Sequence, residues 1–182
     1  MALQFLKRIF NPNKVEIELN EIQALILRSR PIPYFGTVAI IEIKDAVAAR
    51  QMLQKLLPIV SSAEDWHKNE GASVTLTFTY KGLEKIGVPQ ESLDTFPESF
   101  KEGMAERSRF LYDIGVNDPK NWEKVFKRSH IHIAAAVIAN NEEEWKSKLE
   151  EFRSELANNS GVEVIMSHDF AVSEEVKNVS FS

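Results

Sequence analysis

The chain has 182 residues, 43% of them hydrophobic, and its 22 Lys and Arg against 27 Asp and Glu give a formal net charge of −5. This length fits one domain, which can bury roughly 70% of its extended surface without a covalent cross-link. The sequence contains no cysteine, which excludes disulfides, thiolate metal sites and cysteine nucleophiles. Its acidic balance argues against a nucleic-acid partner. No apolar run approaches the roughly 18 residues of a membrane-spanning helix, so we expect a soluble, cytoplasmic protein.

The N-terminal segment has a short amphipathic pattern. Leu3, Leu6 and Phe10 recur at helical spacing, with basic residues between them. The segment lacks the longer apolar core and the cleavage site of a secretory signal. It could lie on a membrane or a partner as a short helix, but so short a helix is marginal without packing. We therefore predict that residues 1–20 form an arm docked on the domain, and expect no membrane contact from residues 1–14.

The first half of the chain alternates strand-like and helix-like stretches. Residues 22–28 are mostly apolar and are followed by Pro31, so we predict a strand there. Residues 37–43 are almost continuously apolar, as a strand buried on both faces would be. Asp45 can cap the next helix, whose apolar residues share one face as far as Leu57.

The remaining core elements follow the same alternation. Residues 73–80 alternate apolar and hydroxyl side chains, as a strand with one face in the core does. Residues 130–138 are a further strand candidate, with small alanines that let a helix pack closely. Asn141 and Glu144 have the spacing of a capping box at the start of an amphipathic helix. Residues 162–166 are predicted to form the last strand.

In chain order the core is strand, helix, strand, insertion, strand, helix, strand. This is the split β-α-β order of a ferredoxin-like α+β fold, in which two helices cover one face of an antiparallel sheet. We predict one such domain over residues 21–172. Its helical insertion, at about residues 81–129, is too long to be a plain connection between neighbouring strands. Residues 173–182 are predicted to form a polar tail.

The four histidines are the first candidates for chemistry. His130 and His132 lie two apart on one predicted strand, so their side chains leave the same face and could chelate a metal. A metal site also needs a third ligand, which the sequence does not offer, so we predict no metal site and no catalytic residue. His67 lies in a polar loop, whereas His168 follows the last predicted strand. His130, His132 and His168 are kept as candidate cofactor ligands.

The sequence contains no motif of a self-contained enzyme. Its seven glycines are scattered and form neither a P-loop nor a dinucleotide-binding fingerprint, and no G-x-S-x-G elbow occurs. The acidic runs at residues 142–144 and 150–151 fall on the polar side of a predicted helix, where such runs are normally solvated. Arg107 and Arg109 accompany Glu102 and Glu106 on a helix of the insertion, where we expect ion pairs.

Four blocks between residues 20 and 170 stand in a characteristic order. They are residues 22–28, residues 78–83 with Gly87 and Pro89, residues 96–107, and residues 111–115 with Pro119 and Trp122. Their order and spacing resemble the N-terminal half of dye-decolourising (DyP-type) haem peroxidases. Members of that family have two ferredoxin-like domains in one chain, with haem b held mainly by the second domain. The resemblance thus implies the same fold as the periodicity.

The resemblance also implies a catalytic apparatus that this chain lacks. In the family it consists of a distal aspartate in a G-x-x-D-G motif, a distal arginine and a proximal histidine on the haem iron. The motif does not occur here and no histidine matches the proximal position, so we carry over no functional residue. Peroxidase chemistry needs both an axial ligand and a distal proton-transfer group. We therefore expect a family half that is inactive alone and acts as a scaffold or assembly half, with haem b only when a second domain completes it. A stand-alone domain, a truncated gene product and a fragment of a longer enzyme all fit this expectation.

Other functions stay open from the sequence. Ferredoxin-like sheets pair by their faces or edges, so the chain could form homo-oligomers or dock on a separate haem-bearing half. Apolar residues, rather than Thr75, Thr77 and Thr79, on the uncovered sheet face would favour such a partner. A stand-alone homodimeric α+β barrel, as in the distantly related chlorite dismutases, could instead bind haem or a small ligand through one of the three candidate histidines. RNA binding is disfavoured by the acidic balance.

Overall fold

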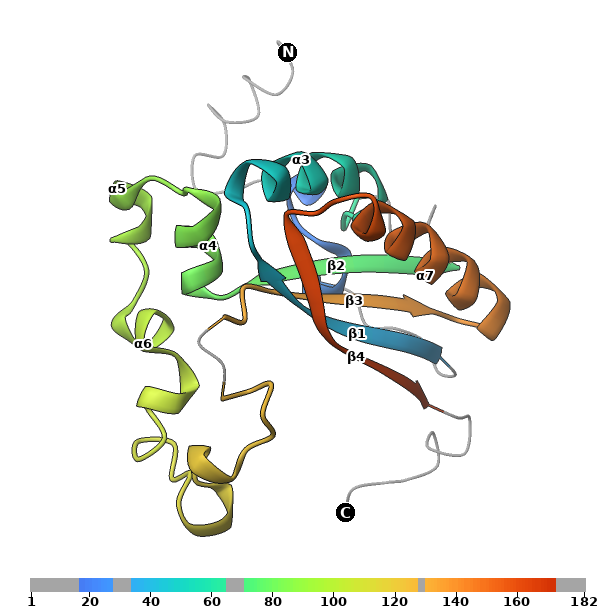
Figure 1. The fold of residues 1–182 in the computed structure, drawn as a ribbon. Coiled ribbons are helices and arrows are strands. Elements are labelled where there is room, and N and C mark those ends of the chain that lie inside the picture. The colour runs from blue at the N-terminus through green and yellow to red at the C-terminus, as the bar shows by residue number, and fades with distance from the viewer. Residues whose placement is uncertain (1–16, 28–33, 65–70, 128–129, 173–182) are drawn as a thin grey trace, which may run out of the picture.

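A computed structural model describes residues 17–27, 34–64, 71–127 and 130–172. Its centre is a four-stranded antiparallel sheet in the order β2-β3-β1-β4 (Figure 1). The strands are β1 (Tyr34–Ile43), β2 (Ala72–Phe78), β3 (Ile133–Ala139) and β4 (Val162–Val172). Two helices, α3 (Ala46–Leu56) and α7 (Glu142–Ala157), cover one face of this sheet. The predicted ferredoxin-like α+β fold is therefore confirmed.

The hydrophobic core lies between the sheet and these two helices. Every second residue of each central strand points into it, so that Ile41 of β1 faces Ile133 of β3, and Ala39 faces Ala135. The buried core residues are Ala39, Ile41, Ile43, Ala49, Met52, Leu56, Val74, Leu76, Ile133, Ala135, Val137, Leu149, Phe152 and Leu156. Burial of this apolar surface is the main term that stabilises the fold.

The two core helices begin at the predicted caps. The side chain of Asp45 accepts a hydrogen bond from the Ala48 N–H at 2.7 Å, and that of Asn141 accepts one from the Glu144 N–H at 2.9 Å. Each cap satisfies an amide that the first helical turn leaves without a partner.

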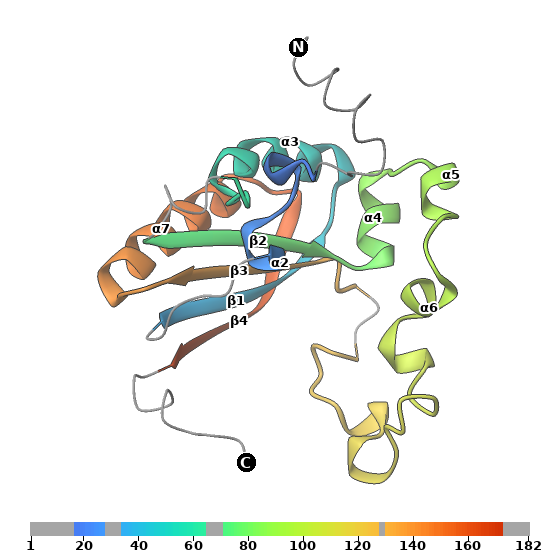
Figure 2. The same ribbon diagram turned by 180° about the vertical axis from the view of Figure 1, so that it is seen from behind.

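The insertion leaves one end of the sheet. It contains α4 (Tyr80–Ile86), α5 (Gln90–Leu93), α6 (Glu98–Glu106) and two 3-10 turns, η3 (Gly115–Asn117) and η4 (Pro119–Asn121). We call residues 98–127 the arm. In Figures 1 and 2, which view the molecule from opposite sides, the arm descends past the sheet on the side away from α3 and α7.

The prediction of a strand over residues 22–28 is wrong. The chain there forms a short helix, α2 (Ala24–Leu27), preceded by the 3-10 turn η1 (Leu19–Glu21). The Gln23 side chain occupies the edge of β2 instead, donating to the Leu76 carbonyl and accepting from the Leu76 N–H, both at 2.8 Å. A short apolar run does not distinguish a strand from a helix, and here one amide side chain takes the place of a strand.

Other boundaries move as well. β1 starts at Tyr34, and β4 runs on to Val172, so His168 lies within that strand and not after it. β2 ends at Phe78, and the Thr79 hydroxyl caps α4 by accepting from the Gly82 N–H at 3.0 Å. β3 starts only at Ile133, so the histidines at 130 and 132 precede the strand. The insertion helix that was predicted to carry Arg107 and Arg109 ends at Glu106 and is already interrupted at Gly103, whose φ is 75°. The N-terminal arm and the polar tail are still predictions, because residues 1–16 and 173–182 lie outside the described ranges.

Candidate functional site

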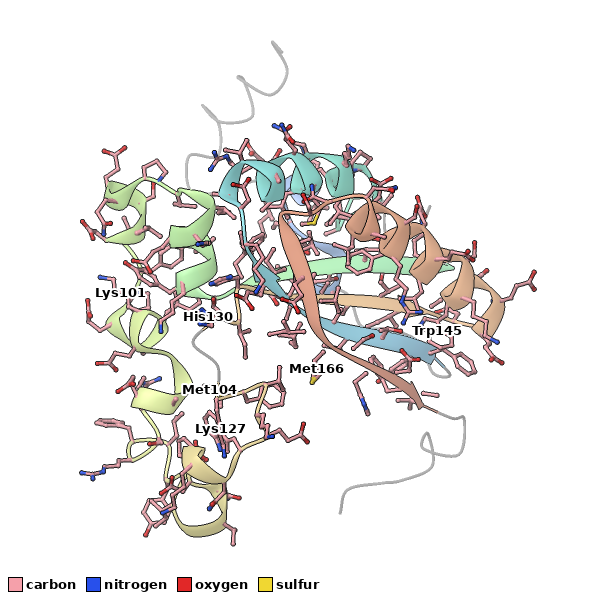
Figure 3. The ribbon with its side chains drawn as sticks, viewed as in Figure 1. Lys101, Met104, Lys127, His130, Trp145 and Met166 are labelled. Carbon is pink, nitrogen blue, oxygen red and sulfur yellow. The ribbon has the colours of Figure 1, made fainter. Side chains whose placement is uncertain are left out.

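The sheet has a second face, which α3 and α7 do not cover, and which we call the open face. Strand register assigns to it the residues that alternate with the core positions. They are Gly36, Val38 and Ile40 on β1, Ser73, Thr75 and Thr77 on β2, Ala134, Ala136 and Ile138 on β3, and Met166, His168 and Phe170 on β4. In Figure 3, Met166 points away from the two helices. On β1, β3 and β4 the residues of this face are thus mainly apolar.

The hydroxyl side chains of the open face lie on β2. Figure 2 shows α2 beneath this strand, on the side away from α3. The Thr77 hydroxyl donates to the Ala134 carbonyl at 3.0 Å. Ser73 Oγ and Thr75 Oγ1 are buried and, among the described residues, have no hydrogen-bond partner. Of the three threonines that the sequence analysis singled out, two lie on this face, whereas Thr79 has left the strand to cap α4.

An aromatic side chain crosses two strands of the open face. Gly36 of β1 lies opposite Phe170 of β4, and a Cβ at Gly36 would come within 2.3 Å of the Phe170 ring. The same ring meets Tyr34 edge-on, with 6.2 Å between the ring centroids. The glycine therefore makes room for the ring to lie flat across its backbone, which covers that part of β1.

On the helix side of the sheet, two successive side-chain hydrogen bonds hold the edge strand β4 in place. The Trp145 indole N–H donates to Thr37 Oγ1 at 2.9 Å, and the Thr37 hydroxyl donates to Asp169 Oδ1 at 2.7 Å. Trp145 belongs to α7, Thr37 to β1 and Asp169 to β4, so these two hydrogen bonds connect three elements. The Thr37 hydroxyl lies beside a carboxylate, but Thr37 is 1% exposed, so a substrate cannot reach it and the arrangement is structural.

His132 lies at the root of the insertion. Its side chain is 6% exposed, and its Nδ1 accepts a hydrogen bond from the Ile43 N–H at 2.8 Å. Its carbonyl accepts from the Thr79 N–H at 3.1 Å, which joins the end of β1 to the start of α4. Burial lowers the pKa of His132, and the nearby Glu42 carboxylate opposes that effect only in part.

A charged group surrounds the same end of β1. Lys44 Nζ lies 2.9 Å from carboxylate oxygens of both Glu42 and Glu163. The hydrogen bond from Lys44 is the main reason that the pKa of Glu42 is lowered, and the two hydrogen bonds raise the pKa of Lys44. These are partly exposed pairs that hold β1 and β4 in register, and pairs of this kind contribute little to stability.

Among the candidate cofactor ligands, His132 is held in a way that does not suit haem iron. Because Nδ1 of His132 is an acceptor, its Nε2 carries the proton in the neutral ring and has no lone pair for iron. His130 and His168 are exposed, and His67 lies outside the described residues. No group of three His, Asp or Glu side chains in the described ranges could hold a metal ion. The expectation that one of these histidines ligates a cofactor therefore gains no support from geometry.

Four surface cavities lined by described residues lie along α7 or at the β2 edge. One of about 460 Å³ is bounded by α3, β2 and the chain before α2, with Leu53, Leu57 and Phe78 in its apolar wall. The Arg50 guanidinium beside it donates to the Ile86 carbonyl at 2.6 Å. No histidine lines this cavity or those along α7. None of the helices in the described part of the chain is long and apolar enough to cross a membrane.

The sequence analysis raised an uncovered sheet face as a partner surface but did not establish which residues occupy it, and it did not identify the exposed apolar residues of the arm. One signal for the face existed, because the apolar run of residues 37–43 predicts a strand buried on both sides. Helices cover only one side of β1. On the other side Gly36 and Ile40 are already buried, whereas Val38 is partly exposed and can be buried by a partner. No comparable signal marked the arm, whose apolar residues have neither helical nor strand periodicity.

Comparison with known proteins agrees with this architecture. Residues 21–172 match the model of the DyP dimeric alpha+beta barrel domain. A search of curated proteins finds no match. Among solved structures, an ancestral D-type dye decolorizing peroxidase is similar with a TM-score of 0.73 and 23% identity, over 87% of this chain and 36% of that one. A structure described as DyP follows with a TM-score of 0.71 and 18% identity, over 86% and 34%.

A fungal DyP-type peroxidase from Auricularia auricula-judae has a TM-score of 0.70 and 15% identity, over 87% of this chain and 34% of that one. At these identities the structural likeness establishes the fold. The chain spans about a third of the length of these solved relatives. Since the family model covers most of the chain, the protein belongs to the dye-decolourising peroxidase family, as one of its DyP dimeric alpha+beta barrel domains.

Proposed function

We propose that this chain is the non-catalytic, sheet-pairing half of a dye-decolourising peroxidase assembly. Its open face packs against a second ferredoxin-like sheet, which for the isolated chain is a second copy of itself. The observation that carries the proposal is the apolar open face of a sheet whose other face is fully used by α3 and α7. Apolar patches of this kind mark interaction surfaces.

The residues of the open face suit a sheet partner better than a ligand. Val38, Ala136 and Ile138 offer small and medium apolar side chains, and Met166 can adapt its shape to a partner. Stacked sheets pack about 10 Å apart through side chains of this size. A self-complementary face produces a two-fold dimer, in which the same patch is used twice. The word dimeric in the description of the matching domain agrees with this arrangement.

The proposal assigns no catalytic step to this chain. His132 is held as a hydrogen-bond acceptor, and the charged groups near the sheet are engaged in the pairs described above. A peroxidase reaction requires an organised axial ligand and a distal acid-base group. The chain's contribution is then structural: it buries one face of a second domain and holds it in place.

The catalytic part of the proposal is tested by titrating the purified protein with hemin while recording absorbance, followed by peroxide-dependent dye oxidation on the same sample. We expect diffuse, non-saturating spectra and background oxidation. His168→Ala, which removes the exposed imidazole of the open face, should behave as the wild type. Saturable one-to-one binding with a sharp Soret band, lost in a single-histidine variant, would overturn the proposal and establish a compact haem protein.

The pairing part is tested by sedimentation velocity over a concentration series. We expect the wild type to dimerise and Met166→Glu to weaken the dimer about tenfold or more, because a charge would be buried in an apolar interface. Val47→Glu is the matched control, since Val47 is 55% exposed on α3, on the covered side of the sheet. Circular dichroism confirms that both variants fold. A monomeric wild type, or equal effects of the two variants, would contradict sheet pairing.

A further inference from the structure

The arm exposes more large apolar side chains than any other described region. Seven of the thirteen exposed large hydrophobic residues of the described ranges lie in it. They are Met104, Phe110, Leu111, Tyr112, Ile114, Val116 and Phe126. Phe110 is 89% exposed, Val116 87% and Tyr112 78%. Side chains of this size, clustered at the tip of a protruding segment, indicate a contact surface.

The tip of the arm holds its shape through its own hydrogen bonds. The Trp122 indole N–H donates to the Asn117 carbonyl at 2.8 Å, and the Asn121 side-chain amide donates to the Gly115 carbonyl at 2.8 Å. The Asp113 N–H donates to the Ser108 carbonyl at 2.7 Å. The apolar side chains are thus presented on a preformed loop, which lowers the entropy lost when a partner binds.

One backbone feature of the tip supports this interpretation. Tyr112 has a φ of 62°, the only positive φ among the non-glycine residues of the described part. A bulky residue in the left-handed region costs about 1–2 kcal/mol. The strained turn places Phe110 and Tyr112, on either side of Leu111, toward solvent instead of into a local core.

The charges of the arm favour a protein partner over a lipid surface. Residues 98–127 contain six Lys or Arg and six Asp or Glu, so the arm is formally neutral. Segments that bind anionic membranes combine apolar side chains with an excess of basic residues. A neutral apolar loop lacks that attraction and matches the apolar, weakly charged centre of a protein interface.

The position of the arm identifies the partner. The arm descends on the side of the open face (Figures 1 and 2). In Figure 3, Met104 of the arm and Met166 of the open face both lie on the side of the sheet away from α3 and α7. A second sheet packed on the open face therefore has the arm beside it. We infer that the arm clasps the second copy of this chain, so that each protomer of the dimer buries the apolar tip of its partner's arm. This inference rests on the proposed function, because it needs a second copy on the open face.

The experiment uses the absence of cysteine from the sequence. Val116→Cys labelled with an environment-sensitive fluorophore reports directly on the arm, and Val47→Cys with the same label is the control on α3. We expect the emission at position 116 to shift to the blue with rising protein concentration, in parallel with dimer formation followed by sedimentation. The emission at position 47 should not change. A dimer that forms while the position 116 emission stays constant would overturn the clasp and leave sheet pairing intact.

A second variant tests the energetic contribution. The double variant Phe110→Ser with Val116→Ser should weaken dimerisation about tenfold or more, whereas Val47→Ser with Leu57→Ser, two exposed apolar residues outside the arm, should leave it unchanged. Equal dissociation constants for the two double variants would overturn the clasp. An emission shift at position 116 on addition of phosphatidylcholine–phosphatidylserine vesicles, without any shift on dimerisation, would overturn it in favour of a membrane contact. A wild type that stays monomeric would refute sheet pairing as well.

Discussion

The body of the domain and its arm use similar residues in opposite ways. In the body, phenylalanine at position 152 is 1% exposed, whereas in the arm phenylalanine at position 110 is 89% exposed. The body buries its apolar residues because strand alternation and capped helices bring them to one layer. The arm is ordered by hydrogen bonds among its own loops and leaves its apolar residues outside. The difference indicates that the body is built for stability and the arm for contact.

The largest expected effect comes from making the same substitution, phenylalanine to alanine, once in the body and once in the arm. Phe152→Ala should lower the free energy of unfolding by about 3–5 kcal/mol, because it leaves a cavity in the core. Phe110→Ala should change it by less than about 0.5 kcal/mol under dilute conditions, where the protein is monomeric. Urea denaturation followed by circular dichroism measures both. Comparable losses in the two variants would show that the arm has a core of its own.

The contact between α4 and His132, where the arm joins the body, should be nearly as sensitive to substitution. A Cβ at Gly82 of α4 would lie 2.1 Å from the carbonyl oxygen of His132. Because the obstacle is backbone, Gly82→Ala should destabilise the protein by about 3 kcal/mol, at the upper end of overpacking effects. Lys81→Ala, an exposed position one residue earlier, should be close to neutral. Equal unfolding midpoints for the two variants would mean that α4 can shift without cost.

The same joint should make stability depend on pH. Burial holds the pKa of His132 below its ordinary value of 6.5, so below pH 6.5 the unfolded chain binds a proton that the folded protein resists. The free energy of unfolding should be constant above neutral pH and fall as the pH decreases through 6.5. An imidazolium also cannot accept the Ile43 N–H, so this hydrogen bond is lost on protonation.

Equilibrium unfolding between pH 5 and 8 measures this dependence. His132→Asn keeps an acceptor near Nδ1 without a titrating group and should flatten the curve. His168→Gln removes an exposed histidine of β4 and should keep the wild-type slope. If the slope survives in His132→Asn, another group is responsible for it.

The smallest expected effect concerns the β2 edge of the open face and has the opposite sign. Thr75 Oγ1 is buried without a partner in the described part of the chain, so Thr75→Val should raise the free energy of unfolding by about 1 kcal/mol. Thr77→Val removes a hydroxyl that donates to the Ala134 carbonyl and should not stabilise the protein. Thermal unfolding distinguishes the two, with a shift of about 2–4 °C expected for Thr75→Val. A loss of stability in both would indicate that Thr75 also has a partner.

Most of the fold could be predicted from the sequence because its core elements have regular periods. The strand over residues 73–80 and the helix capped by Asn141 follow from patterns of two and of three to four residues. The error at residues 22–28 arose where a single long-range contact decides the conformation. Gln23 pairs with Leu76, 53 residues away, and no local pattern encodes that pairing.

The candidate site was less accessible to sequence reasoning. The histidines were prominent as residue types, yet the structure shows that His132 is a structural acceptor and that His168 is exposed. The open face is defined by which side of the sheet the helices cover. An almost continuously apolar strand does not show in its sequence which of its two faces that is. The conformation of the arm's tip depends on a positive φ at Tyr112. Because bulky non-glycine residues seldom adopt a positive φ, the sequence gives no signal for this turn.

The amide of Gln23 at the outer strand has a consequence for how far assembly can proceed. Open-ended polymers of sheets grow when a free edge of one molecule pairs with a different free edge of the next. Here the Gln23 side chain is hydrogen-bonded to both the N–H and the C=O of Leu76. These backbone groups of β2 are therefore not available to pair with a strand of another molecule. Among the strands that the structure describes, β4 is then the remaining edge, and pairing of that edge with itself closes after two molecules. Together with the Ser61 N–H, which donates to the Val74 carbonyl at 3.1 Å, Gln23 therefore favours finite edge-paired complexes over open-ended growth.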